Sequence, residues 1–327
     1  MVKRAASISR TSEGIMNILV DGGEGHVLTQ RITPYLNKIG HSIVKYPSNY
    51  DIHLAFVRFS YNSNVPRIVR IDGIYYDTDI NYNNRNSGIS MSHSSAKGII
   101  YQSDFSRMMC ERYLSPRKKD TIYSIIHNGI DPMWCGESVE HKAFNIVVSA
   151  KWRRHKRLLE TINIFLKFNK IIPNSNLLIL GKLHDNKEIK HSNIKYFGHL
   201  DYIQMKDVFK YSDVSMHLSK KDSCPNTVVE TIGAGIPTIT TNSCGGAVEM
   251  CKLTEGCIIV DGDGSYLDTD PCRPYSDEYN KLSKEVEDNL IEALLKIEKD
   301  KRRVIVPEQL TAEYTANKYV ELIKSCM

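Results

Sequence analysis

Two acidic residues lie in the segment of the sequence that carries the most chemistry. Asp222 and Glu230 are eight positions apart. Pro225 and Asn226 between them suit the start of a helix. One acid would then lie in the loop before the helix and the other further along it, where two carboxylates can accept hydrogen bonds from hydroxyls at separate points of a sugar ligand. A solvated acid pair beside an ordinary helix fits the same spacing.

A run of basic residues follows an apolar segment. Residues 151–157 (KWRRHKR) come directly after an expected strand and open a helix, which is where open α/β sheets place their ligands. Basic side chains of this run are therefore candidates for binding a diphosphate. A solvated charged face and a nucleic-acid patch are the alternatives for such a run.

A glycine-rich turn precedes another expected helix. Gly22 and Gly23 lie within residues 21–26 (DGGEGH), between an apolar run and a helical stretch that ends near Gly40. Glycines at such a turn let backbone N–H groups approach a phosphate, and the helix dipole favours the negative charge. The spacing is not the GxGxxG of dinucleotide sites, so a plain turn is an equal alternative.

Strands and helices that alternate along the chain must position these segments. Short apolar runs alternate with helix-like stretches from residue 16 onward, a pattern typical of βα units around a parallel sheet. The expected strands cover residues 16–20, 42–46, 52–56, 67–71, 98–101 and 121–126, and then 145–149, 177–180, 194–197, 214–218, 238–240 and 258–260. Helices are clearest at residues 157–168 and 283–298, and residues 311–324 also fit a helix. Residues 261–279 are expected to form a loop.

Two sets of strands predict an α/β protein with two Rossmann-like domains, and a length of 327 residues suits two cores. Residues 128–141 interrupt the periodicity with Gly, Pro and polar residues, which places a hinge near residue 140. We therefore expect a first domain over residues 1–140, with a flexible start at 1–14, and a second over 141–305, followed by residues 306–327.

The composition excludes several classes of protein. Hydrophobic residues make up 41% and charged residues 25%, unlike a disordered or fibrous chain. A net charge of +5 is small for a dedicated nucleic-acid binder, and no apolar run approaches the roughly 18 residues of a membrane helix. The eight cysteines form no CxxC pair, and residues 1–14 do not resemble a signal peptide, so we expect a cytoplasmic protein without nucleic-acid partners or transmembrane segments. Peripheral contact with a membrane is compatible with this reading, and the oligomeric state is not indicated.

The order of the motifs resembles retaining glycosyltransferase family 4, which has the GT-B fold. Residues 222–237 contain an acid, seven residues, a Glu and then Gly-x-Pro, similar to the E-x7-E signature of that family. Further matching pieces follow in the family's order: Gly22-Gly23, Gly40-His41, Ser103, residues 128–131 (NGID), Lys151 with Lys156, residues 193–198 (NIKYFG) and residues 244–249 (CGGAVE). The resemblance covers most of residues 16–260.

This resemblance implies a deep cleft between the two domains, with the helix in residues 306–327 packed back on the first domain. It makes Glu230 the ligand of the nucleotide ribose and Asp222 the acid nearest the donor sugar. The other substrate contacts that it implies come from Gly22, Gly23, Lys151, Lys156, Asn226 and Thr227, with the lysines and the glycine turn on the diphosphate.

Three positions depart from the family pattern. Asp222 stands where the family usually has Glu, and Lys151 stands where it has an Arg with a bidentate fork. Many members carry a His after the fourth strand, whereas this chain has Asp72. We expect Asp72 to face the reacting sugar or the acceptor, and we count it with Asp222, Glu230 and Lys156 as a candidate catalytic residue.

The implied reaction moves a hexose, with retention, from a nucleotide sugar to a hydroxyl of a carbohydrate-bearing acceptor, such as a glycan, glycoprotein or lipid. GDP-mannose is the first expected donor, and UDP-glucose or UDP-N-acetylglucosamine the next. No cofactor or metal is required, because lysines and helix N-termini can stabilise the departing diphosphate. Residues 60–64 and 77–88, rich in Asn and Tyr, are expected to form loops that contact the acceptor.

Three other functions compete with this one. A metal-dependent transferase would use a DxD pair, and residues 77–79, 261–263 and 268–270 fit, although so short a pattern is weak evidence. A sugar-nucleotide-binding protein without turnover would keep the same cleft. A nucleic-acid binder would use residues 151–157, but the modest charge argues against it.

Overall fold

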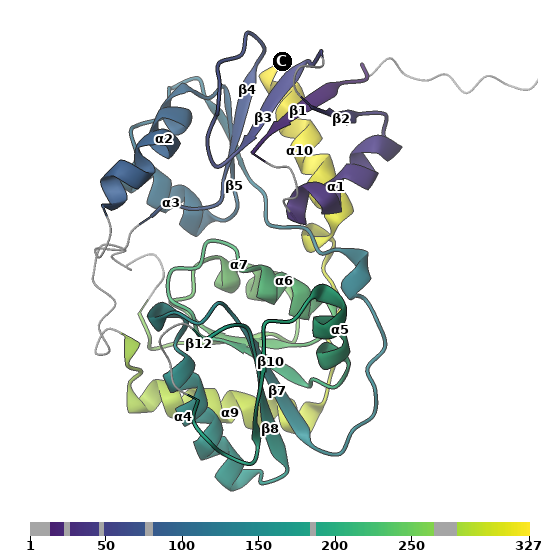
Figure 1. Cartoon of the computed structure of the whole chain (residues 1–327). Coiled ribbons are helices and arrows are strands. Elements are labelled where there is room, and N and C mark those ends of the chain that lie inside the picture. The colour runs from purple at the N-terminus through teal and green to yellow at the C-terminus, as the bar shows by residue number, and fades with distance from the viewer. Residues whose placement is uncertain (1–13, 23–26, 46–48, 76–80, 184–187, 265–279) are drawn as a thin grey trace, which may run out of the picture.

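Two parallel six-stranded sheets organise the chain (Figure 1). The computed structural model describes residues 14–22, 27–45, 49–75, 81–183, 188–264 and 280–327. The first sheet contains, in spatial order, β2 (Ser42–Val44), β1 (Asn17–Asp21), β3 (Ile52–Phe56), β4 (Arg67–Ile71), β5 (Gly98–Tyr101) and β6 (Ile122–Ile125). The second contains β12 (Ile258–Val260), β11 (Thr238–Thr241), β10 (Val214–His217), β7 (Phe144–Ser149), β8 (Ser175–Leu180) and β9 (Ile194–Gly198). The expected strands all form, which confirms the α/β prediction of two parallel sheets.

Both sheets are doubly wound. The second sheet has the strand order of dinucleotide-binding folds, because the chain builds outward from β7 to β9 and then restarts beside β7 with β10. In the first sheet the order reverses between β1 and β3. Ligands of open α/β sheets bind at the carboxyl ends of the strands where the order reverses. The topology therefore predicts a ligand site at the carboxyl ends of β1 and β3 or of β7 and β10.

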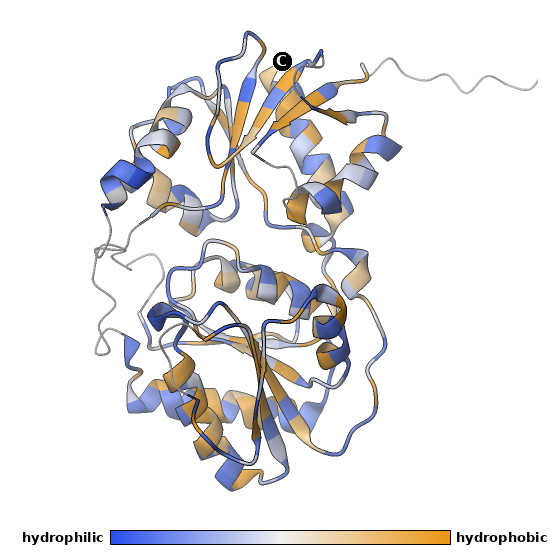
Figure 2. Cartoon of the chain, in the orientation of Figure 1, coloured by the Kyte–Doolittle hydropathy of each residue, from blue (hydrophilic) through white to orange (hydrophobic). Residues whose placement is uncertain are grey.

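Helices cover both faces of the first sheet. One face carries α1 (Val27–Lys38) and α10 (Ala312–Cys326), and the other carries α2 (Tyr82–Ser95) and α3 (Asp104–Tyr113). In α1, Leu28, Ile32 and Leu36 recur at helical spacing and are buried against the sheet. The result is a three-layer domain whose apolar strands occupy the middle, as their orange colour shows (Figure 2).

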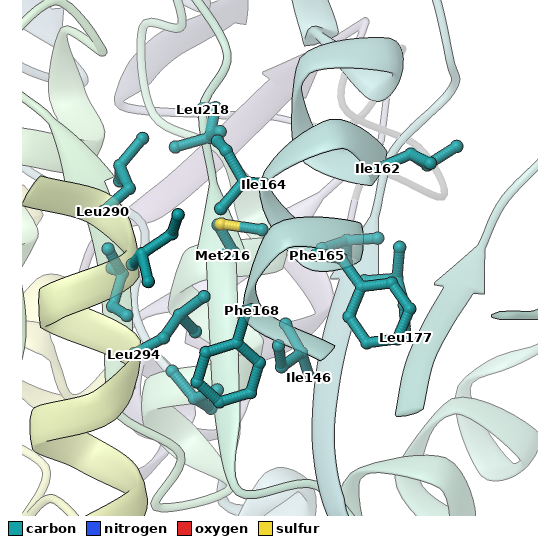
Figure 3. Packing of buried hydrophobic residues seen from close by; sticks show 14 of the residues in the cluster. Ile146, Ile162, Ile164, Phe165, Phe168, Leu177, Met216, Leu218, Leu290 and Leu294 are labelled. Atoms are coloured by element: carbon teal, nitrogen blue, oxygen red, sulfur yellow. The ribbon is translucent and has the colours of Figure 1, made fainter. Parts of the chain in front are cut away.

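The second domain repeats this layering. One face of its sheet carries α4 (Leu158–Ile171) and α9 (Lys284–Asp300), and the other carries α5 (Tyr202–Lys210), α6 (Asn226–Gly233) and α7 (Gly246–Leu253). Phe165 and Phe168 of α4 and Leu294 of α9 converge over the sheet (Figure 3). This core is made by the two helices whose apolar periodicity is clearest in the sequence.

The chain passes between the domains twice. After β6 it runs through the 3-10 turn η1 (Pro132–Trp134) to β7, and after α9 it returns through η3 (Glu308–Leu310) to α10. The final helix then packs against α1, β5 and β6 of the first domain. Strand β7 is followed by a third 3-10 turn, η2 (Arg154–Lys156), which leads into α4.

One expected loop is partly helical. Residues 77–88 were expected to form a loop, but α2 begins at Tyr82 because the Asn81 side chain accepts a hydrogen bond of 3.0 Å from Asn84 N. Residues 76–80 lie outside the described residues, as do residues 265–279 of the other expected loop and residues 1–13 of the start expected to be flexible. Residues 60–64 form a loop as expected.

Candidate active site

A cleft lies between the two domains, beside the carboxyl ends of strands from both sheets. This cleft has a volume of about 460 Å³ and is lined by both domains. Four of the residues singled out in the sequence line it together: Asp72, Lys156, Asp222 and Asn226. Residues separated by up to 154 positions in the sequence are thus brought to one place by the parallel strands that precede them.

Lys156 and Asp222 form an ion pair at the point where the strand order reverses. Lys156 ends η2 after β7, and Asp222 lies in the loop between β10 and α6. The Lys156 Nζ binds Asp222 Oδ2, and His217 Nε2 at the end of β10 lies 3.4 Å from the same oxygen. The acid in this loop therefore faces the basic segment, because β7 and β10 are adjacent in the sheet.

The protonation states of this cluster follow from burial and charge. Burial opposes ionisation of Asp222, but Lys156 and then His217 hold its pKa well below the ordinary value. Burial, followed by the charge of Lys156, lowers the pKa of His155 to about 3. Burial also lowers the pKa of His217. At neutral pH the two imidazoles are therefore neutral, whereas Lys156 and Asp222 form an ion pair. Lys221 lines the cleft beside them.

A buried ion pair behind the cleft fixes the backbone beside Lys156. Arg157 is fully buried with a left-handed backbone (φ 56°), and its Nη2 lies 2.9 Å from Asp263 Oδ1. Asp263 also accepts hydrogen bonds from Thr241 at 2.9 Å and Ser243 at 2.5 Å. The conformation of Arg157 turns the chain from η2 into α4, so this network determines where Lys156 is presented.

The same network bears on the DxD alternative. Asp263 belongs to the candidate pair at residues 261–263, but its carboxylate is buried and bound by Arg157. The pairs at residues 77–79 and 268–270 lie outside the described residues. In the described part of the chain, no group of three or more His, Cys, Asp or Glu residues is placed to hold a metal ion.

Helix α6 connects the loop acid to the second acid of the motif. It begins at Asn226, which is exposed at the cleft and whose Oδ1 accepts a hydrogen bond of 3.0 Å from Asn128 of the first domain. Thr227 Oγ1 donates to Ser149 O at 3.2 Å, which ties the start of α6 to the end of β7. The helix start predicted at Asn226 is present.

Glu230 lies one helical turn beyond Asn226 and is buried at the contact with the first domain. Its Oε1 is 3.1 Å from Nη2 of Arg31 on α1. Burial raises the pKa of Glu230 to about 7, although the Arg31 charge and hydrogen bond act in the opposite direction. Asn226 lines the cleft, whereas Glu230 lies behind it under the Arg31 guanidinium.

Asp72 lies on the wall of the cleft that the first domain provides. It follows β4, binds the buried Arg70 and accepts a hydrogen bond of 2.7 Å from Gln102 Nε2. Next to it, Gly73 has φ +138°, and a Cβ there would lie 2.7 Å from Ser223 Oγ. Glycine at this position lets the loop after β4 approach the loop that carries Asp222.

The remaining predicted residues lie further from the cleft or outside the described residues. Gly22 has a left-handed backbone (φ +70°) at the end of β1, which favours glycine, but Gly23 lies outside the described residues. Lys151 is exposed and, unlike Lys156, does not line the cleft. The structure thus brings Lys156, and not Lys151, to Asp222.

A second contact joins the domains on the other side of the hinge. Glu249 on α7 accepts hydrogen bonds from the N–H groups of Asp104 at 2.9 Å and Phe105 at 3.1 Å, which are the first residues of α3. Its Oε2 also lies 3.1 Å from Nε2 of His127. A carboxylate at a helix N-terminus meets unpaired N–H groups and a favourable dipole. This contact therefore stabilises the arrangement of the domains in this structure.

We expect Glu249→Ala to lower the free energy of unfolding by about 2 kcal/mol, because the variant leaves buried N–H groups of α3 without their charged acceptor. Denaturant titration measures this change. Glu255→Ala, which removes an exposed carboxylate after α7, is the matched control and should change stability by less than about 0.5 kcal/mol. Equal effects of the two substitutions would contradict the role of Glu249.

Three residues at the site had no role in the sequence prediction. Arg31 falls on the apolar face of α1 with Leu28 and Ile32. A charged residue on the buried face of a helix indicates an ion-pair partner, and this was the signal in the sequence for the contact of Arg31. His217 falls within an expected strand, and its Nε2 lies 3.4 Å from Asp222 Oδ2. Glu249 ends the segment CGGAVE, whose spacing gives no indication of a partner on α3.

Comparisons with known proteins agree with this architecture. Residues 137–266 match the family model described as "Glycosyl transferases group 1". HepE from Anabaena in complex with UDP has a TM-score of 0.64 at 12% identity, covering 95% of this chain and 100% of that one. Sucrose-phosphate synthase from Thermosynechococcus elongatus has a TM-score of 0.62 at 11% identity, with coverages of 94% and 98%. No curated protein sequence matches the chain.

A larger transferase matches over part of its length. The pneumococcal O-GlcNAc transferase GtfA, in complex with UDP and GlcNAc, has a TM-score of 0.58 at 13% identity. That match covers 84% of this chain, and the chain spans 57% of the transferase. At these low identities the TM-scores show a shared fold alone, which is GT-B. This fold and the group 1 match over the second domain support a GT-B glycosyltransferase.

No helix among the described residues is both long enough and apolar enough to cross a bilayer.

Proposed function

We propose that this protein is a retaining glycosyltransferase of the family 4 type, which moves a hexose from a nucleotide sugar to an acceptor hydroxyl. The observation that carries the proposal is the convergence of Lys156, Asp222 and Asn226 at the carboxyl ends of β7 and β10, inside a cleft between two Rossmann-like domains. A cation and a helix start at this point of the sheet suit a diphosphate.

In this proposal the second domain binds the donor. Lys156, held beside Asp222, binds the diphosphate, the start of α6 at Asn226 and Thr227 lies beside it, and Glu230 binds the ribose. Asp222, which strong local charge keeps ionised, then faces the donor sugar. Gly22 and Gly23 approach the donor phosphates from the first domain, and Lys151 adds positive charge at the rim.

The reaction places its largest electrostatic demand on the leaving group. The acceptor hydroxyl attacks the anomeric carbon on the face from which the diphosphate departs, and a departing phosphate oxygen takes the hydroxyl proton. Negative charge therefore grows on the diphosphate in the transition state, and the fixed Lys156 ammonium stabilises it. Because these residues supply positive charge, the proposal requires no metal.

The first domain receives the acceptor in this scheme. Asp72 lies on its wall of the cleft and faces the reacting sugar or the acceptor hydroxyl. Domain closure about the hinge near residue 140 would bring residues 1–140 and 141–305 together around both substrates. Donor identity is open between guanosine and uridine nucleotides: GDP-mannose is the expectation from the family resemblance, and the UDP complexes of HepE and GtfA support testing UDP-sugars beside it.

Calorimetric titration with GDP-mannose, UDP-glucose and UDP-N-acetylglucosamine, in the presence of a chelator, tests the proposal. We expect one donor to bind, and we expect Glu230→Ala to weaken its binding at least about tenfold, since the ribose loses a charged hydrogen-bond acceptor. Glu292→Ala removes an exposed carboxylate of α9 and is the matched control.

Two results would contradict this proposal. Binding that needs added Mg²⁺ or Mn²⁺ would favour the metal-dependent alternative. Binding without release of nucleoside diphosphate, in the presence of simple sugar and glycan acceptors, would favour a sugar-nucleotide-binding protein. Release of the diphosphate from the bound donor supports the transferase.

A further inference from the structure

Arg31 carries a buried charge from the first domain into the second. Its side chain is 2% exposed. Nη2 lies 3.1 Å from Glu230 Oε1, and Nη1 donates to Gly129 O at 3.2 Å and lies 3.5 Å from Asn226 Oδ1. One guanidinium thus contacts the hinge segment and two residues of α6, including the one that lines the cleft.

Stability does not explain this ion pair. Burying two charges costs about as much as their attraction returns, and well-packed apolar residues in place of such a pair are often neutral or stabilising. Arg31 lies among Leu28, Ile32 and Leu36 on the buried face of α1, where an apolar residue would suit the packing. Its Nε is buried without a hydrogen-bond partner among the described residues. Burial of Arg31 therefore carries a desolvation cost that an apolar residue at this position would not have.

The contact controls the charge of Glu230. Burial raises the pKa of this carboxyl to about 7, and the Arg31 charge is the main influence that lowers it. Tyr202 of α5 also faces Glu230; its own pKa is raised by burial and then by the charge of Glu230, so the phenol stays neutral near pH 7. Without Arg31, the pKa of Glu230 would rise further and the carboxyl would be mostly protonated at neutral pH.

We propose that Arg31 is a positioning residue for the donor: it favours the ionised form of Glu230 and orients the carboxylate to accept hydrogen bonds from the ribose hydroxyls of a nucleoside diphosphate sugar. This inference rests on the proposed function. Arg31 belongs to the first domain and Glu230 to the second, so the carboxylate is prepared for the ribose only when the domains are in contact. The affinity for the donor thereby depends on contact between the two domains.

The test measures donor binding and steady-state kinetics of Arg31→Met between pH 6 and 9. For the wild type, donor KM falls as pH rises through about 7, because the ionised carboxyl binds ribose hydroxyls better. For Arg31→Met, the midpoint of this fall moves upward by about one pH unit or more, so that donor KM at pH 7 rises about fivefold or more and approaches the wild-type value near pH 9. The kcat at saturating donor changes much less, because Arg31 acts through Glu230 and does not touch the leaving diphosphate.

Two further variants distinguish positioning from a structural role. Arg31→Lys keeps a cation and should restore part of the shift. Arg31→Met/Glu230→Gln removes both charges, so it should fold as the wild type does in thermal denaturation and bind donor weakly at every pH. An Arg31→Met defect of equal size at all pH values would overturn the inference, and so would tighter donor binding, which would make Arg31 a competitor of the ribose.

The failure of this inference and the failure of the proposed function give different results. If the wild type binds no nucleotide sugar at any pH, the proposed function fails and the inference falls with it. If the wild type binds and turns over the donor while Arg31→Met keeps the wild-type pH profile, the inference alone fails.

Discussion

Replacing Lys156 by Met should reduce kcat/KM for the donor about a thousandfold, which is the effect of removing a pre-oriented group that stabilises transition-state charge. The Lys156 Nζ is held at Asp222 by the turn before α4, at the carboxyl ends of β7 and β10. In this arrangement the ammonium group is already fixed where the diphosphate departs. Most of the loss should appear in kcat, since the charge on the leaving group is larger in the transition state than in the bound donor.

The control for this substitution removes an equal charge elsewhere. Lys210→Met takes a lysine from α5, where it pairs with the exposed Asp207, and it should leave kcat/KM unchanged. Lys156→Arg keeps the charge and should recover part of the rate. If Lys156→Met retained the wild-type kcat while its thermal denaturation was normal, Lys156 would not stabilise the leaving group.

The strands of this fold were predictable because buried strands correspond to short apolar runs in the sequence. In β3, the segment Ile52–Phe56 is buried at each position, as expected for a strand covered by helices on both faces. The same reasoning located β10 and β11 on either side of the acidic motif. Once strands and connecting helices alternate, parallel pairing and two sheets follow from the few connections that such units permit.

Helix α2 could not be predicted in this way. Its sequence, YNNRNSGISMSHSS, is rich in Asn and Ser and has little apolar periodicity. The buried side of the helix includes polar residues, among them Asn86 and His93, which find partners within the first domain: Asn86 bonds Tyr75, and His93 bonds Tyr101 at 2.8 Å. Burial of polar groups through specific hydrogen bonds depends on tertiary structure and leaves no periodic signal.

The contacts of the candidate site also divide into those that the strand pattern predicts and those that depend on tertiary structure. Asp222 and Lys156 were predictable as neighbours because each follows a strand of one sheet at its carboxyl end. The partner of Glu230 was not, because Arg31 approaches it across the domain interface from 199 positions away. Contacts between domains depend on how the two sheets face each other, which the strand pattern of either domain alone does not determine.

Removal of residues 307–327 should abolish cooperative unfolding of the first domain. Helix α10 buries Tyr319, Ile323 and Cys326 in the core that it shares with α1 and the first sheet. Without the helix, one face of that sheet would expose a continuous apolar surface, at a cost of about 25 cal/mol for each Å² of apolar area left in water. We expect the truncated protein to aggregate and to lose donor turnover.

A single substitution tests the same contact in a protein that still folds. Ile323→Ala should lower the free energy of unfolding by about 3 kcal/mol, because Ile323 is fully buried and its removal leaves a cavity. Lys324→Ala, at the exposed neighbouring position, should change it by less than about 0.5 kcal/mol. Denaturant titration measures both. The core of the first domain includes α10, which follows the second domain in the sequence. A truncated protein with wild-type stability and turnover would show that the first domain does not need this helix.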